Sequence, residues 1–149
     1  MIELLTADTP NGKKVSIMLE EISFEYKVKK ININPGGEFS KGEQFNSEFR
    51  KISPFSKIPV IIDNENNKET VFESGAILMY LGEKSNKFYE QKNRTKINQW
   101  LMAQMAYVGP MLGQHHQFHR YNSGKDKWGE ERYFKITKTI KSRLGIKGD

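Results

Sequence analysis

The sequence contains no cysteine among its 149 residues. A disulfide framework, a zinc–thiolate site and a thiol nucleophile on the protein itself are therefore excluded. It also lacks an apolar run long enough to cross a bilayer, and Met1–Leu5 has no basic flank followed by an apolar stretch. These absences predict a cytoplasmic location and no membrane partner. Any thiol chemistry must use a sulfur that belongs to a ligand.

The chain is too short, and too poor in apolar residues, to bury two large cores. It has 36% hydrophobic residues, which suffice for one substantial core. Its net charge of +6 is unevenly distributed. Residues 1–85 carry 11 basic and 13 acidic side chains, whereas residues 86–149 carry 13 and 5. The basic residues are scattered over helical positions and form no dense arm, so we expect no nucleic-acid partner and instead a basic wall near a small anionic ligand.

Hydrophobic spacing in the first 85 residues predicts the order βαβ followed by ββα, an α+β arrangement. The apolar parity of the second strand changes at Ile31 and Ile33, which indicates a bulge or the end of that strand. The expected elements are a strand at 2–5, a helix through 15–22, a strand from 24 to 28, a turn at 48–52, strands at 58–62 and 70–72, and a helix over 76–83.

The second half of the sequence is predicted to be helical. A linker at 84–89 leads to a long helix at about 92–111, and a second helix is expected over 129–143. Gly109 and Pro110 should kink or end the first helix, because proline cannot donate an intrahelical hydrogen bond. The predicted domains are therefore residues 1–85 and residues 90–149.

Near the middle of the chain, the segment Ser53–Val60 places a proline at the start of an apolar strand. The segment Phe72–Ile77 follows, and its polar residues mark the start of a helix. A cis proline in such a place exposes the preceding backbone N–H and C=O, which an extended ligand can bind. Ser74 is a good N-cap, so free N–H groups and the positive helix end would face a ligand carboxylate. The pair suits a small anionic peptide, although a trans proline and an ordinary helix cap fit the same residues.

Two polar residues, Thr9 and Asn11, fall between the first strand and the first helix. There a hydroxyl, a carboxamide and helix N–H groups can converge on a sulfur and favour its thiolate form. On residue chemistry alone, Asn11 could equally serve only as a cap of the helix.

Three histidines, His115, His116 and His119, invite a metal interpretation, because imidazoles four residues apart on a helix can bind zinc. No cysteine or acidic residue lies nearby in the sequence as a third ligand. We therefore predict no metal site.

Several separate motifs resemble the glutathione S-transferase superfamily, and within it the bacterial nu-class branch of disulfide-bond oxidoreductases. The similarity extends over nearly all residues from Met1 to about Arg143, with the motifs in the family's order. The matching motifs are Thr9–Gly12, Gly42–Phe45, the Ile58–Pro59 pair, Phe72–Ile77 and Gly109–Gln114.

This resemblance implies a thioredoxin-like N-terminal domain that binds glutathione, followed by an all-helical C-terminal domain. Family members continue with several more helices, whereas this sequence ends at Asp149. We therefore expect a truncated helical domain with apolar faces that lack their usual cover.

The resemblance also assigns roles at the sulfur of glutathione. Thr9 and Asn11 stand where other classes place a catalytic tyrosine, serine or cysteine, which favours thiol–disulfide exchange over ordinary conjugation. It implies that Pro59 is cis and that the backbone of Ile58 binds the cysteinyl unit of glutathione.

The remaining ligand residues follow from the same comparison. Glu73 and Ser74 match the residues that hold the γ-glutamyl end, and Gln44 and Lys57 match residues near the glycyl end. Arg132 matches an arginine that reaches the ligand from a neighbouring subunit, which implies a homodimer. From the residues alone, Lys57 is another exposed lysine, and Arg132 is equally well explained as a solvated helix arginine.

The function implied is a glutathione-dependent disulfide-bond oxidoreductase with weak transferase activity, for which glutathione and glutathione disulfide are the co-substrates. The three histidines are then expected to line the side of the second substrate. Two alternatives stay open at this point: a non-catalytic binding module with the same fold, and an inactive truncated relic.

Overall fold

The structure is a computed structural model in which residues 1–33 and 42–147 are described. It divides into two compact units, Met1–Arg94 and Thr95–Asp149. Asn34-Pro35-Gly36-Gly37, a sequence that favours a break after the second strand, and the first part of the polar stretch 36–47 that follows lie outside the described residues.

The first unit is built on a four-stranded sheet in the order β2-β1-β3-β4. Strands β1 (Ile2–Thr6) and β2 (Tyr26–Lys30) are parallel and are joined through helix α1 (Pro10–Ile22). Strand β3 (Val60–Asp63) runs antiparallel to β1, and β4 (Glu69–Phe72) returns beside β3 before helix α3 (Ser74–Ser85). The βαβ and ββα halves confirm the expected α+β, thioredoxin-like arrangement.

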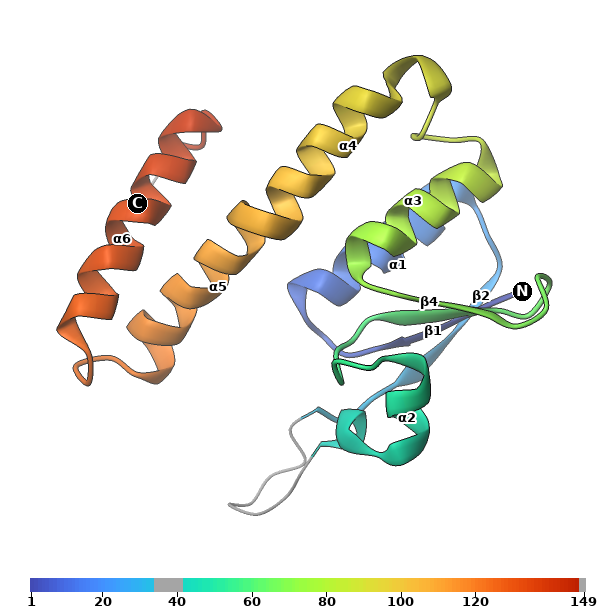
Figure 1. Cartoon of the computed structure of the whole chain (residues 1–149), viewed down its shortest axis with the longest axis horizontal. Coiled ribbons are helices and arrows are strands. Elements are labelled where there is room, and N and C mark those ends of the chain that lie inside the picture. The colour runs from blue at the N-terminus through green and yellow to red at the C-terminus, as the bar shows by residue number, and fades with distance from the viewer. Residues whose placement is uncertain (34–41, 148–149) are drawn as a thin grey trace. The chain divides into compact units, whose positions relative to one another are not determined.

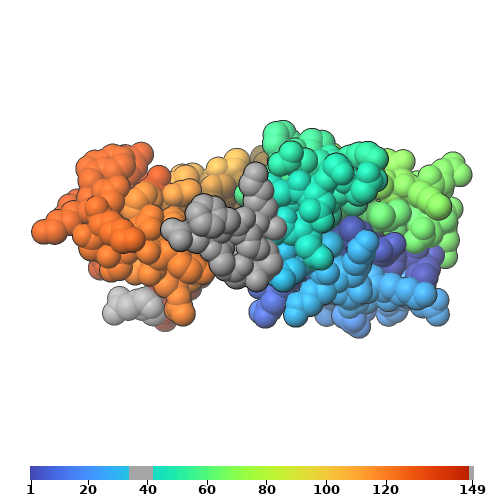
Figure 2. Space-filling view, turned by 90° about the horizontal axis from the view of Figure 1, so that it is seen from below, coloured from blue at the N-terminus to red at the C-terminus, as the bar shows by residue number. Residues whose placement is uncertain are grey.

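Each face of the sheet has its own core, because side chains alternate along a strand. Leu4 and Ile61 point to the face that α1 and α3 cover, whereas Leu5 and Val60 point to the face of helix α2 (Ser47–Ile52) (Figure 1). Val15, Leu19 and Ile22 complete the first core from α1, and Ile77 and Leu81 from α3; all of these are buried. Helix α2 and strand β2 lie side by side on the surface seen in Figure 2.

The strand boundaries differ slightly from the predictions. Strand β2 begins at Tyr26 and ends at Lys30, so the parity change at Ile31 marks the end of the strand. Ile31 then turns into the second core, where it is buried, and its N–H donates to the Thr6 carbonyl at 2.8 Å. Val28 lies on β2, an edge strand of the sheet, and is 58% exposed.

The second unit consists of a long helical stretch and the helix α6 (Lys127–Arg143). The stretch comprises α4 (Arg94–Ala103), a π-helical segment Gln104–Val108, α5 (Gly109–His116) and a second π-helical segment Gln117–Tyr121. Phe118 stacks on Tyr133 with ring centroids 5.2 Å apart, and a Cβ on Gly129 would lie 2.5 Å from the Phe118 ring. This close approach explains why glycine occupies the first turn of α6.

Gly109 and Pro110 do not end the helix, contrary to the expected boundary near Met111. The π-helical segment precedes them, and the Gly109 N–H donates to the Gln104 carbonyl five residues earlier. Pro110 then falls in the first turn of α5, directly after the π-helical segment, and the chain stays helical through it. Helical structure therefore continues to Tyr121.

Several large apolar side chains of the second unit are exposed. Trp100, Tyr121 and Trp128 are 59%, 64% and 67% exposed, whereas Ile140 is buried. None of the helices in the described part of the chain combines the length and apolar character that a membrane span requires.

Candidate functional site

Three of the segments that carry predicted ligand residues, those of Thr9, Pro59 and Glu73, lie at one end of the sheet. In the strand register, Leu5 lies opposite Val60, and Val60 lies opposite Phe72. The chain therefore leaves β1 toward Thr9, enters β3 from Pro59 and leaves β4 toward Glu73 at the same end of the sheet. Helices α1 and α3 both begin there (Figure 1). Two helix N-termini at the same end of the sheet create a positive electrostatic field that favours an anion.

Thr9 is the N-cap of α1. Its Oγ1 accepts a hydrogen bond from the Gly12 N–H at 3.1 Å, and Pro10 occupies the first turn. A Cβ on Gly12 would lie 2.3 Å from Thr6 Oγ1, so glycine lets the first turn approach the end of β1. Because Thr9 Oγ1 accepts this bond, its own hydroxyl hydrogen can still be donated to an anion.

Asn11 does not cap the helix, so the alternative that made capping its role is wrong. It lies within the first turn of α1, it is exposed, and its Oδ1 accepts a hydrogen bond from Lys14 Nζ at 2.9 Å. Thr9 is the N-cap because the helix begins at Pro10, the residue before Asn11.

The segment before β3 is fixed by one buried serine. Ser53 Oγ donates to the Lys57 carbonyl at 2.8 Å and accepts from the Lys57 N–H at 3.1 Å. The Ile58–Pro59 peptide bond is cis, as expected, and Ile58 lies outside the strand register, which begins at Val60. Lys57 is exposed and Ile58 is half-buried. The sequence reasoning did not single out Ser53, whose only signal was its position four residues before Lys57.

Replacing Ser53 by alanine should loosen this segment. Both polar groups of the Lys57 backbone would lose their partner, and Ser53 is only 1% exposed, so we expect a loss of about 1–2 kcal/mol in the free energy of unfolding. Hydrogen exchange of the Lys57 amide should accelerate. The control is Ser16→Ala, which removes an exposed bond to the Lys13 carbonyl. Unchanged protection of Lys57 in the Ser53 variant would contradict this role.

Glu73 and Ser74 occupy positions different from those predicted at the start of α3. The N-cap is Glu73, whose carbonyl accepts from the Ile77 N–H at 2.9 Å and whose side chain makes no capping bond. Ser74 is therefore the first helical residue, and it is buried. Glu73 has φ 70° and ψ 119°, a backbone conformation that side chains disfavour. Its exposed carboxylate lies at the common edge of the sheet.

Gln44 lies in a 3₁₀ turn, Glu43–Phe45, and is turned inward. Its Nε2 donates to the Ile33 carbonyl at 3.2 Å, while its buried Oε1 has no hydrogen-bond partner among the described residues. In this arrangement Gln44 connects the turn to the segment that follows β2. Its contact with a ligand stays a prediction.

A hollow of about 540 Å³ adjoins the residues just before Thr9. This volume falls in the range of small-molecule sites. It is lined by Ala7, Asp8, Lys30, Ile31, Asn32, Ile33 and Glu43.

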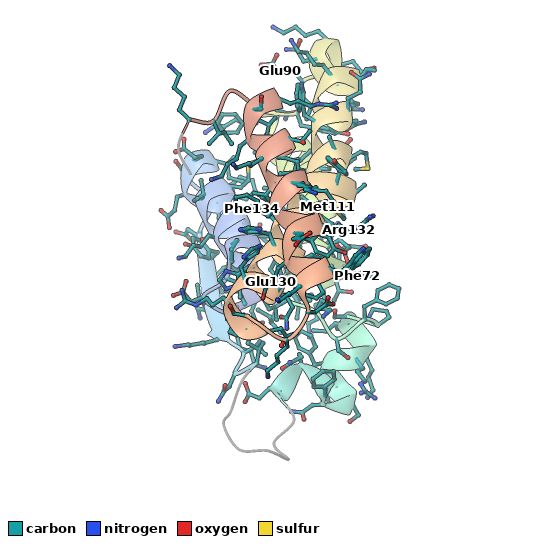
Figure 3. The ribbon with its side chains drawn as sticks, turned by 90° about the vertical axis from the view of Figure 1, so that its left-hand side faces the viewer. Phe72, Glu90, Met111, Glu130, Arg132 and Phe134 are labelled. Carbon is teal, nitrogen blue, oxygen red and sulfur yellow. The ribbon has the colours of Figure 1, made fainter. Side chains whose placement is uncertain are left out.

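Arg132 and the histidines belong to the second unit. Arg132 and Phe134 project from opposite sides of α6 (Figure 3), and the Arg132 guanidinium lies 5.2 Å from the centroid of the Trp128 ring. His119 Nε2 contacts the Glu130 carbonyl at 3.0 Å, so this nitrogen carries the proton. Burial and the neighbouring His119 lower the pKa of His115, whose ring centroid is 4.2 Å from that of His119. In the described part of the chain, no three His, Cys, Asp or Glu residues are placed to share a metal ion.

Comparison with protein families gives one match, to the glutathione S-transferase N-terminal domain, over residues 3–83. The disulfide-bond oxidoreductase YfcG of Escherichia coli K12 is 41% identical over 139 residues, which are 89% of this chain and 62% of that protein. The chain thus spans less than two thirds of the length of this relative.

Solved structures give the same fold. A glutathione transferase family member from Pseudomonas fluorescens, with two glutathione molecules bound, superposes with a TM-score of 0.84 at 39% identity. A glutathione transferase from Pseudomonas putida, with one glutathione disulfide bound per subunit, superposes with a TM-score of 0.83 at 38% identity. Each alignment covers 96% of this chain and 63% of the other.

Proposed function

The chain belongs to the glutathione S-transferase family, and from this membership we propose that it binds glutathione and uses the bound thiol for thiol–disulfide exchange. One observation supports the proposal. Thr9, the cis Pro59 segment and Glu73 lie with two helix N-termini at the same end of the sheet. The bound forms of the solved relatives, glutathione and glutathione disulfide, support the same ligand class.

Each part of glutathione meets a suitable group in this arrangement. The γ-glutamyl ammonium would pair with the Glu73 carboxylate, and its carboxylate would lie at the positive N-terminal end of α3, at Ser74. The Ile58 backbone would bind the cysteinyl unit as an added strand. Lys57 and Gln44 would lie near the glycyl end.

The sulfur would lie near Thr9 and Asn11, where a hydroxyl donor and a carboxamide donor stabilise the thiolate. The thiolate attacks one sulfur of a disulfide, forms a mixed disulfide with it and expels the other sulfur as a thiolate, which takes up a proton. A second glutathione then attacks the mixed disulfide, which yields glutathione disulfide and the second free thiol. Because the chain has no cysteine, every sulfur that reacts in these steps comes from a ligand.

The first test is calorimetric titration with glutathione and glutathione disulfide, followed by a turnover assay with a model disulfide. For Asn11→Ala we expect affinity within about twofold of the wild type and about tenfold slower exchange, because one hydrogen bond to the thiolate is lost. Asn93→Ala, in an exposed turn, is the matched control. A folded wild-type protein that binds neither form of glutathione would refute the proposal.

A second candidate is a binding module without turnover. The match with YfcG covers 62% of that protein, so binding by the shared part and turnover by the whole relative are tested separately. Glutathione binding without disulfide reduction would select this candidate. Absence of binding by a folded chain would correspond to the inactive relic.

We also propose that Arg132 acts on glutathione bound by the other copy in a homodimer. A guanidinium has the planar donor geometry that a carboxylate needs, and Arg132 is exposed on α6. Sedimentation of the wild type, with and without glutathione, tests for the dimer.

A further inference from the structure

Two neighbouring lysines in the first turns of α1 have different surroundings. Lys13 is 66% exposed and forms an ion pair with Asp8 at 3.0 Å. Lys14 is half-buried, burial lowers the pKa of its ammonium, and its Nζ donates to Asn11 Oδ1 at 2.9 Å. Lys14 therefore contacts a residue of the proposed thiolate site, whereas Lys13 contacts a surface carboxylate.

The bond from Lys14 determines which end of the Asn11 carboxamide is available to a ligand. A carboxamide has an acceptor oxygen at one end and two N–H donors at the other. An ammonium can donate only to the oxygen. In the reversed orientation the NH₂ group would face Lys14 with no acceptor between them, and the oxygen would face the ligand. A thiolate accepts hydrogen bonds, so it needs the donor end of the carboxamide, which is the end that Lys14 does not contact.

We infer that Lys14 is a positioning residue, which holds Asn11 so that its Nδ2 hydrogens face the sulfur of bound glutathione. The inference rests on the proposed function. In this arrangement Lys14 acts on the thiolate through Asn11, and a simple contribution to helix stability would leave the ionisation of the ligand unchanged.

The test measures the pKa of the bound glutathione thiol from the ultraviolet absorbance of its thiolate as a function of pH. Lys14→Met should raise this pKa and slow disulfide exchange at neutral pH about threefold to fivefold, without changing the affinity for glutathione disulfide, which has no thiol. Lys14→Arg should restore most of the rate, because arginine also donates to the oxygen. Lys13→Met, the matched control, should behave as the wild type.

A double-mutant cycle separates positioning from the direct effect of a positive charge. If Lys14 acts through Asn11, Lys14→Met should have little further effect in the Asn11→Ala background. An undiminished effect there, or a Lys14→Met protein with an unchanged thiol pKa, would overturn the inference while leaving glutathione binding intact. Failure of the wild type to bind glutathione would instead refute the proposed function itself.

Discussion

Replacement of Asp63 by asparagine is expected to lower the free energy of unfolding by about 3 kcal/mol. Asp63 ends β3, and its side chain is fully buried. Its Oδ2 accepts from Lys84 Nζ at 2.5 Å and from the Tyr80 hydroxyl at 2.7 Å, and its Oδ1 accepts from the Glu65 N–H at 3.0 Å. An amide has only one acceptor atom, so it cannot satisfy all three donors, and the Lys84 ammonium loses its nearest carboxylate and keeps Glu65 at 3.8 Å. Chemical denaturation, in which the unfolding transition of the first unit is monitored, measures the loss of stability.

The control for this change is an ion pair with a similar distance on the surface. Glu48 and Lys51 lie 2.6 Å apart but are 79% and 67% exposed, so Glu48→Gln should change the free energy of unfolding by less than about 0.5 kcal/mol. Equal losses in the two variants would contradict a special role for the buried network.

The same network predicts how stability depends on pH. Burial opposes the charge of Asp63, but hydrogen bonds from Lys84, Tyr80 and the Glu65 N–H outweigh it, so the pKa of Asp63 is lowered. A lowered pKa in the folded state gives stabilisation that is complete above the unfolded pKa and is lost as the pH falls through the folded pKa. The difference between the wild type and Asp63→Asn should therefore shrink in acid. A difference that stays constant with pH would be inconsistent with an ionised Asp63.

The sequence was sufficient to predict the strands and their order along the chain, because both core faces depend on local alternation. Leu4 and Leu5 alternate between two cores, and Val60 and Ile61 do the same from β3. The continuation of the helix through Pro110 was not predictable in this way. It depends on a π-helical segment, and sequence spacing does not reveal the change of hydrogen-bond pattern that makes room for proline.

The candidate site was only partly visible in the sequence. Residue chemistry indicated Thr9 and the family resemblance indicated Glu73. Their backbone roles depend on where each helix begins, which sequence patterns place only within a few residues. Ser53 and Lys14 were missed because each acts by a hydrogen bond to a neighbour along the chain, and a serine or lysine four or three residues away is common by chance.

The conformation of Glu73 gives the largest expected effect on binding. A residue other than glycine at φ 70° and ψ 119° costs about 1–3 kcal/mol, so glycine should relieve strain and leave the free energy of unfolding unchanged or raised by about 1 kcal/mol. Glu73→Gly also removes the carboxylate proposed to bind the γ-glutamyl ammonium. Loss of one charged hydrogen bond should weaken glutathione binding by about 10-fold to 100-fold. Thermal unfolding and calorimetric titration measure the two effects separately.

Two further variants separate charge from strain. Glu73→Gln keeps the side chain and the strained backbone, so it should lose affinity without gaining stability. Asn67→Gly changes another residue with positive φ, 49°, in the turn between β3 and β4, and it should leave glutathione affinity unchanged. A strained residue whose removal costs binding but not stability is characteristic of a functional site. Wild-type affinity in Glu73→Gly would show instead that the strain serves only the start of α3, and that the γ-glutamyl end of glutathione is held elsewhere.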